Sequence, residues 1–451
     1  MYKIKSKRVV ASLFVFIICT SIYLMGPIRI AGDVVPASLL PLSIASQHSI
    51  YLDRFVGFYK GNQVNVPFYF HRYGSHYISA YPITLPLIIS PIYMMLQIFY
   101  NFKNMPIGQL IPFAYKIGKV ISAILTALSV MFFFIFIESL SGDRIKSILL
   151  SFIYAFATEN WAIASNSLWQ HGFSELMIVL CFISILKLEN NTQQKAFAFL
   201  LGLFVSLAVS ERPTDLVFAI PLLVYVLLYK REFVLYFLSA PFITGGALIT
   251  YNLKYFGRLS GGYYSSFNEN IFKGVAGLLL SPGRGLFVYT PIAIFSLIGL
   301  VFSFKDIKTA NKIYPIASIF IIGQLLLIAK WNMWWGGWTY GPRLLTDTSP
   351  ALILLLLPVL TIIEKKRLFI SLFVIFVAIS IFIQIMGRFC VGGYEWNAYF
   401  NVDKHPDKLW NIKESPLLWS IENKRITNST NTLPNHMFLK HVSDINRNFH
   451  E

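Results

Sequence analysis

Charged residues are scarce in this sequence. Asp, Glu, Lys and Arg make up 13% of the 451 residues, and hydrophobic residues make up 56%. Soluble domains carry about 25% charged residues, so an ordinary water-soluble fold is excluded. The apolar residues recur in runs along most of the chain. That pattern is typical of a polytopic membrane protein, and the sequence therefore predicts an all-α, multi-pass fold in contact with membrane lipids.

Cysteine and acidic residues are also few. The three cysteines lie far apart and form no CxxC pattern, which excludes a disulfide framework and a zinc knuckle. The 21 acidic residues are outnumbered by 38 basic ones, giving a net charge of +17. The basic residues occupy short gaps between apolar runs, and no basic helix interleaved with aromatic residues occurs. The excess charge therefore indicates membrane topology, and no nucleic-acid partner is predicted.

Eleven apolar runs are predicted to cross the bilayer, several of them only with tilt or local thinning. They are 9–28, 113–137, 147–164, 172–187, 196–210, 213–229, 233–250, 286–304, 313–330, 344–363 and 368–387. A further run, 82–100, is ambiguous because it has three prolines in its first half.

The basic connectors decide how this ambiguous run is interpreted. They are 143–146, 187–195, 230–231, 305–312 and 364–367. If 82–100 does not cross, all five lie on the same side as the basic N-terminus, and such loops prefer the cytoplasm. We therefore expect 82–100 to lie in the interface or to re-enter, with the N-terminus cytoplasmic. Residues 1–390 are predicted to form the membrane domain, with an amphipathic first external loop at 29–112. Residues 391–451 are predicted to form an extracytoplasmic tail or cap.

Polar residues gather on the predicted external side. Asp33 follows the first apolar run; it could be an interfacial acid, or a general base for a lipid-anchored substrate. His71 and Arg72 stand in PFYFHRYGSHYISAYP, where an aromatic belt explains the tyrosines but less well the His-Arg pair. His171 and Glu175 lie in WQHGFSE, where a carboxylate near lipid depth is either functional or a helix cap.

Three arginines stand beside later runs on the same side. Arg212 lies in SERPTD, whose charges could simply pair with one another. Arg284 lies between glycines in SPGRG, where a phosphate could approach the backbone closely, although a basic anchor is the simpler alternative. Arg343 ends the stretch KWNMWWGGWTYGPR. This stretch contains more aromatic residues than an interfacial belt requires, and they predict a platform on which a sugar ring stacks. The residues of this platform are Trp334, Trp335, Trp338 and Tyr340.

Together these features resemble the GT-C superfamily of integral-membrane glycosyltransferases, and within it the branch of protein O-mannosyltransferases and lipid A aminoarabinose transferases. The points of resemblance are the Asp33 loop, the Tyr/Pro-rich stretch before the second run, the WQHGFSE turn and the GPRLL stretch. They cover the layout of residues 1–390. The sequence departs from the oligosaccharyltransferases of this superfamily because WWGGW lacks the acid of their WWDYG motif. No acid pair follows the second run, so no metal ligands are predicted and a divalent metal stays an open alternative.

The resemblance implies a polyprenyl-phosphate sugar donor, a lipid, glycan or protein acceptor, and transfer on the extracytoplasmic face. Asp33 matches the acid that serves as base in such enzymes. A single base without a second carboxylate favours inversion at the anomeric carbon. Phosphate is expected to be bound by Arg284 and Arg343, with Arg72 or Arg212. A lipid-linked glycan polymerase or ligase, a lipid or sugar transporter and a membrane scaffold are the alternatives.

Overall fold

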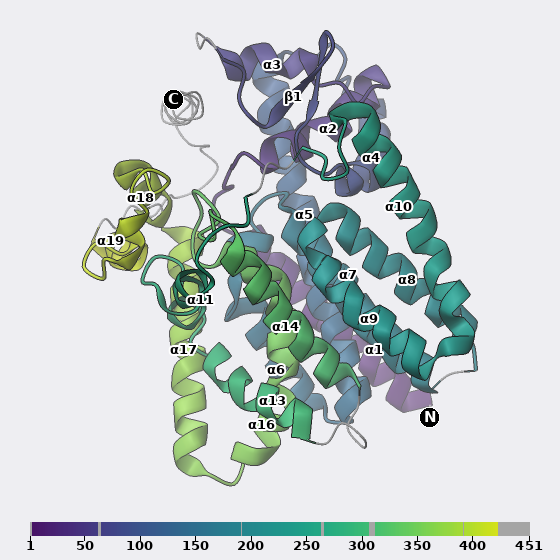
Figure 1. Cartoon of the computed structure of the whole chain (residues 1–451), viewed down its shortest axis with the longest axis vertical. Coiled ribbons are helices and arrows are strands. Elements are labelled where there is room, and N and C mark those ends of the chain that lie inside the picture. Colours follow the sequence, from purple (N-terminus) through teal and green to yellow (C-terminus); the bar gives the residue numbers. More distant parts are fainter. Residues whose placement is uncertain are drawn as a thin grey trace.

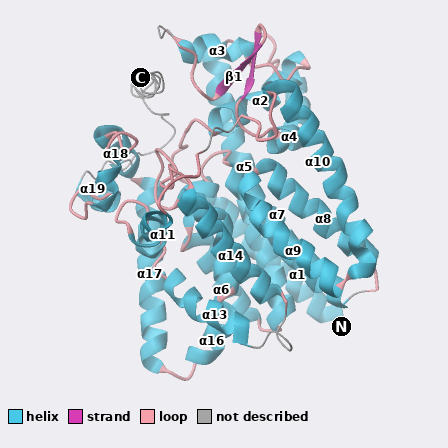
Figure 2. Cartoon of the chain, in the orientation of Figure 1, coloured by secondary structure: helices cyan, strands magenta, loops and turns pink. Residues whose placement is uncertain are grey.

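The fold is described from a computed structural model that covers residues 2–61, 65–190, 192–262, 266–305, 312–390 and 392–422. Most of the basic connector 305–312 and the last part of the predicted tail lie outside the described residues. The structure is mostly helical (75%), with one short hairpin of strands (Figures 1 and 2).

The helices of the first half are α1 (Tyr2–Leu24), α2 (Val34–Gln47), α3 (Asp53–Lys60), α4 (Thr84–Phe99), α5 (Ile107–Ser141), α6 (Arg144–Phe156), α7 (Gln170–Asn190), α8 (Gln194–Glu211), α9 (Leu216–Tyr229) and α10 (Val234–Phe256). Those of the second half are α11 (Ile271–Leu280), α12 (Leu286–Tyr289), α13 (Ala293–Lys305), α14 (Ile313–Lys330), α15 (Ser349–Leu354), α16 (Leu356–Ile363), α17 (Arg367–Phe389), α18 (Gly392–Phe400) and α19 (Pro416–Glu422).

Shorter elements punctuate these helices. A π-helical turn, η1 (Asn160–Ala164), follows α6, and four 3₁₀ turns are η2 (Pro213–Asp215), η3 (Arg231–Phe233), η4 (Arg343–Thr348) and η5 (Pro406–Trp410). Strands β1 (Phe70–Tyr73) and β2 (His76–Ser79) pair antiparallel, with Phe70 opposite Ser79. Gly74 has φ +58°, which suits the tight turn between them.

Six helices are long and apolar enough to cross a membrane: 107–141, 170–189, 194–211, 231–256, 313–330 and 367–389. The bent pair Arg343–Leu354 and Leu356–Ile363, with 43° between its halves, raises this number to seven if it is one span. Eleven were expected. Among the other apolar runs, 213–229 and 286–304 form helices shorter than 18 residues, Pro213–Tyr229 and Ala293–Phe304. The structure supports a multi-pass membrane protein, and the count of eleven stays a prediction.

Ion pairs hold several connectors together at one end of the bundle. Glu138 contacts Arg8 at 3.0 Å and Arg144 at 2.7 Å, which joins the start of α1 to the α5–α6 connector. Lys146 contacts Glu364 at 3.2 Å, and this adds the α16–α17 connector. Figure 1 shows the N-terminus and α16 at this lower end. The predicted grouping of these basic connectors is therefore present in the fold.

The segment between α1 and α5 begins and ends at the same end of the bundle, opposite the end that holds these ion pairs. Arg8 lies beside Glu138, whereas the Lys119 ammonium donates a hydrogen bond to the Tyr23 carbonyl, so α1 and α5 run antiparallel. Helix α4 has 16 residues and lies within this excursion. The chain therefore makes no net crossing between Leu24 and Ile107, in agreement with the interpretation that 82–100 does not cross.

Helix α2 differs from the expected amphipathic segment. Twelve of its 14 residues are buried, on every face of the helix. It packs against α4 and α5 beneath the hairpin, at the upper end in Figure 1. An amphipathic surface helix was the wrong interpretation for this part of the loop, because α4 and α5 pack against it and most of its side chains are buried.

Candidate functional site

Three buried side chains from three separate segments meet at the end of the bundle opposite the basic connectors. The Asp347 carboxylate accepts a hydrogen bond from the ring Nδ1 of His171 at 2.9 Å and one from Nε of Arg212 at 2.5 Å. The side chains of His171 and Asp347 are fully buried, and that of Arg212 is 7% exposed. Because the Arg212 charge and the Asp347 charge compensate each other, this arrangement is stable only while both remain.

Local chain geometry brings these residues to one place. Arg212 ends α8 in an extended conformation, since the residue before a proline is disfavoured in a helix and Pro213 follows it. His171 lies in the first turn of α7, and Asp347 lies in the 3₁₀ turn η4. Each side chain therefore projects from a point where an apolar helix begins or ends.

A second ion pair adjoins the first. The Arg343 Nη1 donates to Asp33 Oδ2 at 2.6 Å, and its Nη2 donates to the Gly336 carbonyl at 3.0 Å. The guanidinium carbon of Arg343 lies 4.7 Å from the centre of the Trp169 ring, a favourable cation–π geometry. Arg343 and Asp347 belong to the same 3₁₀ turn, so the two pairs form one cluster, which we call the acid–arginine cluster (Asp33, His171, Arg212, Arg343 and Asp347).

Asp33 is the member of this cluster that reaches the surface. Its side chain is 17% exposed, whereas those of His171 and Asp347 are fully buried. Burial raises the pKa of Asp33, but the Arg343 guanidinium beside it outweighs burial and holds that pKa below its usual range. Asp33 is therefore a carboxylate at neutral pH, with one oxygen held by Arg343.

Further acids line the buried side of the cluster. Glu175 is one helical turn after His171 on α7, so both side chains lie on the same face, and Glu175 is fully buried. Asp215, at the end of η2, accepts a hydrogen bond from the Ser174 hydroxyl and is also fully buried. Within the described residues, no three His, Cys, Asp or Glu side chains are arranged to hold a metal ion.

The cluster lies where two apolar cores meet. Trp169 and Phe173, on either side of His171, belong to the core formed around α2, α4 and the start of α5. Leu344 and Leu345, next to Arg343, belong to the larger core of the helical bundle. Apolar walls on both sides lower the local dielectric and strengthen the ion pairs between them.

Comparisons with known proteins add nothing to this geometry. No protein-family model, curated protein or solved structure matches the chain. The functional argument therefore depends on the arrangement of the residues themselves.

Five residues predicted from the sequence come together here. They are Asp33, His171, Glu175, Arg212 and Arg343, which are drawn from four segments that were predicted to be external. Asp347 and Trp169 belong to the same site but were not among the predicted site residues. Asp347 could have been found as an acid within an apolar run, and Trp169 as the neighbour of the predicted histidine.

His71 and Arg72 lie elsewhere. The His71 ring packs at 4.7 Å from the Phe256 ring at the end of α10. The Nε of Arg72 donates to the Gly74 carbonyl within its own turn at 3.2 Å. The described contacts of both residues belong to the hairpin and its neighbours rather than to the acid–arginine cluster.

Arg284 has the contacts of a structural residue. It is fully buried and donates to the carbonyl oxygens of Gly283 (2.7 Å), Trp335 (3.1 Å) and Gly337 (3.1 Å). It also donates to the side-chain oxygen of Asn397 at 2.5 Å. The glycines beside it admit protein carbonyls rather than a phosphate, so the interpretation of Arg284 as a phosphate ligand is not supported by its geometry.

The predicted aromatic platform is largely buried. Trp334 is 1% exposed and packs so closely on Gly277 that a β-carbon there would lie 2.4 Å from its ring. Trp335 is 8% exposed and donates to Asp403 at 2.8 Å, and Tyr340 is fully buried with its hydroxyl bonded to the Ile383 carbonyl. Buried rings offer no face to a sugar, so of the four predicted residues only Trp338, which is partly exposed, keeps that capacity.

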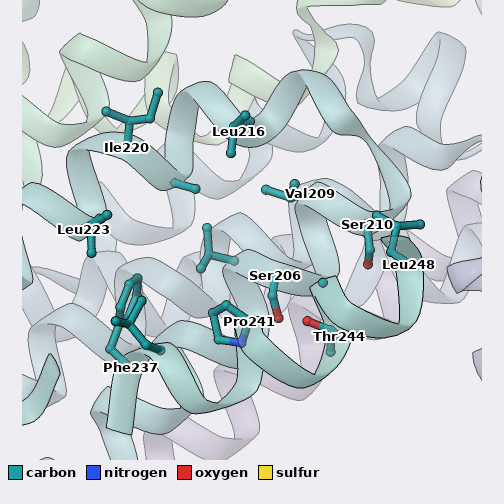
Figure 3. Close-up of a pocket in the computed structure, with 14 residues that line it drawn as sticks. Ser206, Val209, Ser210, Leu216, Ile220, Leu223, Phe237, Pro241, Thr244 and Leu248 are labelled. Atoms are coloured by element: carbon teal, nitrogen blue, oxygen red, sulfur yellow. The ribbon is translucent and has the colours of Figure 1, made fainter. Parts of the chain in front are cut away.

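An apolar groove of about 240 Å³ lies between α8, α9 and α10 (Figure 3). Its lining includes Val209, Leu216, Phe237 and Pro241, with a few hydroxyls among them. Helices α8 and α10 are both long and apolar enough to cross a membrane. Ser210 lies in its wall, two residues before Arg212, which brings one end of the groove close to the acid–arginine cluster.

Proposed function

We propose that this chain is an integral-membrane glycosyltransferase that moves a sugar from a polyprenyl-phosphate donor to an acceptor hydroxyl on the extracytoplasmic face. The observation that carries the proposal is the acid–arginine cluster. A partly exposed carboxylate, Asp33, is held by Arg343 at the end of an apolar helical bundle. Placing two ion pairs among apolar residues is costly, and charged groups at membrane depth usually mark a functional site.

The proposed side of the membrane follows from the connectors. Arg8, Arg144 and Lys146 lie at the end of the bundle opposite the cluster, and basic connectors prefer the cytoplasm. The cluster would then face outward, where polyprenyl-phosphate sugars are accessible after translocation. The N-terminus is cytoplasmic in this arrangement.

The proposed reaction uses Asp33 as the general base. Its carboxylate takes the proton of the acceptor hydroxyl as the acceptor oxygen bonds to the anomeric carbon. The bond from that carbon to the phosphate oxygen breaks, and the lipid phosphate leaves with the electron pair. Attack opposite to the leaving group inverts the anomeric configuration, and no covalent sugar–enzyme intermediate is needed.

The remaining cluster residues position this base. Arg343 occupies one oxygen of Asp33, which leaves the other oxygen to meet the acceptor. The Asp347 contacts to His171 and Arg212 fix the 3₁₀ turn that carries Arg343. A base that is held in one orientation before the substrate arrives loses little entropy in the transition state.

The groove between α8, α9 and α10 supports a lipid-linked donor. It is lined mostly by apolar side chains, and its wall includes Ser210, two residues before Arg212. A prenyl chain in this groove would bring its phosphate toward the arginines of the cluster. The partly exposed Trp338 is the residue of the predicted platform that could contact a sugar.

The decisive experiment is a transfer assay in liposomes with labelled polyprenyl-phosphate sugars. Asp33→Asn is expected to lower the rate by about 100-fold or more, because general-base catalysis contributes about 10²–10⁴-fold. Asp53→Asn is the matched control, since Asp53 lies in the same loop and contacts His76 and the Tyr77 amide instead.

Three results would overturn the proposal. Equal rates for Asp33→Asn and the parent would remove Asp33 as the base. Transfer from a diphosphate-linked glycan alone would favour a polymerase or ligase. Movement of labelled lipid or sugar across the bilayer without transfer would favour a transporter.

A further inference from the structure

Three buried cations lie together without a direct ion pair to an acid. Arg29 and Lys119 are 5% exposed, and Arg388 is fully buried. Among the described residues, none of the three forms an ion pair with a carboxylate, in contrast to Arg212 and Arg343. Buried charges in proteins are usually paired, so this cation cluster (Arg29, Lys119 and Arg388) calls for a source of negative charge.

Backbone carbonyls supply part of that charge. Arg388 donates to the carbonyls of Met25 and Pro27, the latter at 2.7 Å, just beyond the end of α1. Lys119 donates to the carbonyl of Tyr23, in the last turn of α1. The C-terminus of a helix carries about half a negative charge, so it compensates a minor part of two full positive charges.

Arg29 has the least compensation of the three. Its Nη2 donates to the Cys390 carbonyl at 2.9 Å, and its guanidinium lies 4.7 Å from the centre of the Tyr394 ring. Both contacts are to neutral groups, and the Glu395 carboxylate interacts with Arg29 electrostatically without forming an ion pair. The positive charge of Arg29, on the loop between α1 and Asp33, is therefore only partly compensated.

Two N–H donors in the cation cluster have no acceptor. The Nε atoms of Arg29 and of Arg388 are buried, and neither makes a hydrogen bond in the structure. Arg284 is a useful contrast, because the same type of side chain there donates to four protein oxygens. Unused guanidinium donors beside uncompensated charge are typical of a site that receives an anion with several oxygens.

We propose that Arg29, Arg388 and Lys119 form a binding site for a phosphoryl group. A phosphate monoester carries about 1.5–2 negative charges and three acceptor oxygens, which matches three cations and two unused donors better than a single carboxylate does. Guanidinium groups bind phosphate oxygens in a directed manner, whereas the ammonium contributes a point charge.

The site lies at the end of α1, beside the start of the first loop. A phosphoryl group could reach it as the headgroup of a membrane lipid or as free phosphate, since both present the same oxygens. Binding there would hold residues 25–33 against α17, because Arg29 and Arg388 come from these two segments. The inference does not depend on the proposed glycosyl transfer.

The test measures binding to the delipidated full-length protein in detergent. The first assay measures the thermal unfolding midpoint in inorganic phosphate and in chloride at equal ionic strength. The second assay uses native mass spectrometry to compare the binding of phosphatidic acid with that of phosphatidylcholine. A ligand that binds only the folded state raises the midpoint, and the increase grows with the logarithm of the ligand concentration above its dissociation constant. The parent is expected to bind a phosphoryl probe. Arg29→Gln removes one charged contact and is expected to raise the dissociation constant of that probe by at least about tenfold.

Two further variants keep the test decisive. Arg144→Gln removes an arginine at the opposite end and is expected to leave phosphoryl binding unchanged. Arg29→Lys keeps the charge and is expected to bind with intermediate affinity, and it replaces Arg29→Gln if that variant fails to fold.

Binding of phosphatidic acid alone would identify a lipid headgroup as the source, and binding of inorganic phosphate as well would identify a general phosphoryl site. A parent protein that binds neither probe would overturn the proposal. An affinity that is the same in the parent, Arg29→Gln and Arg29→Lys would overturn it as well.

Discussion

Asp347→Asn should destabilise the protein strongly, because it removes the carboxylate that forms an ion pair with the buried Arg212. The substituted side chain has almost the same shape, so packing is preserved and the change is one of charge. Both partners are nearly inaccessible, with exposed fractions of 0% for Asp347 and 7% for Arg212. Breaking a buried ion pair by removing one partner typically costs about 3–5 kcal/mol. The hydrogen bond from His171 is weakened by the same change.

The measurement is unfolding of the purified protein by SDS in mixed micelles, with the parent and the variant compared under the same conditions. The matched control is Glu364→Gln, which removes a carboxylate from the exposed pair with Lys146, where the Glu364 side chain is 46% exposed. Exposed pairs contribute about 0.2–1 kcal/mol, so the control should lie close to the parent.

A double variant separates charge compensation from other effects. Asp347→Asn combined with Arg212→Gln removes the uncompensated cation as well, so it should be less destabilised than Asp347→Asn alone. If Asp347→Asn unfolds within about 0.5 kcal/mol of the parent, a change expected of ordinary surface substitutions, the acid–arginine cluster is not a buried ion-pair network.

Two further predictions concern the pH dependence and the orientation of the chain. Because Arg343 holds the pKa of Asp33 below its usual range, the base stays ionised and transfer should remain level as the pH falls from about 7 to about 5. Arg343→Gln removes the cation but leaves the burial, so the pKa of Asp33 rises and the loss of rate moves to higher pH; superimposable pH–rate profiles would contradict this. For orientation, Asp53→Cys should react with a membrane-impermeant maleimide in intact cells, and Glu364→Cys only after permeabilisation. The opposite labelling pattern would place the cluster in the cytoplasm.

The sequence predicted much of the acid–arginine cluster but little of its pairing. Asp33, His171, Arg212 and Arg343 were found because each interrupts the apolar pattern on the same predicted side. Their partners depend on tertiary contacts: Asp33 and Arg343 are 310 positions apart, and no local signal joins them. Asp347 was not predicted as a site residue, although it is an acid within the apolar run 344–363.

The predictions that the geometry does not support have a common physical origin. Arg284 between two glycines, and Trp334 beside two more, have the local pattern of a ligand site. Whether such residues meet a ligand or protein is decided by segments that are distant in the sequence, here those that contain Asn397 and Gly277. Helix α2 is similar, because its covering helices lie elsewhere in the chain. Local pattern indicates where polar residues begin and end a helix, but not what surrounds them.

The long sequence separation between Asp33 and Arg343 has a consequence for biosynthesis. Asp33 emerges from the ribosome early, whereas its guanidinium partner is made 310 residues afterwards. During that interval the carboxylate is without its cation, and the helices that will enclose it are absent. The acid–arginine cluster can therefore be completed only after Arg343 has been made, so nascent chains truncated before Arg343 would expose an unpaired acid to the quality-control machinery of the membrane.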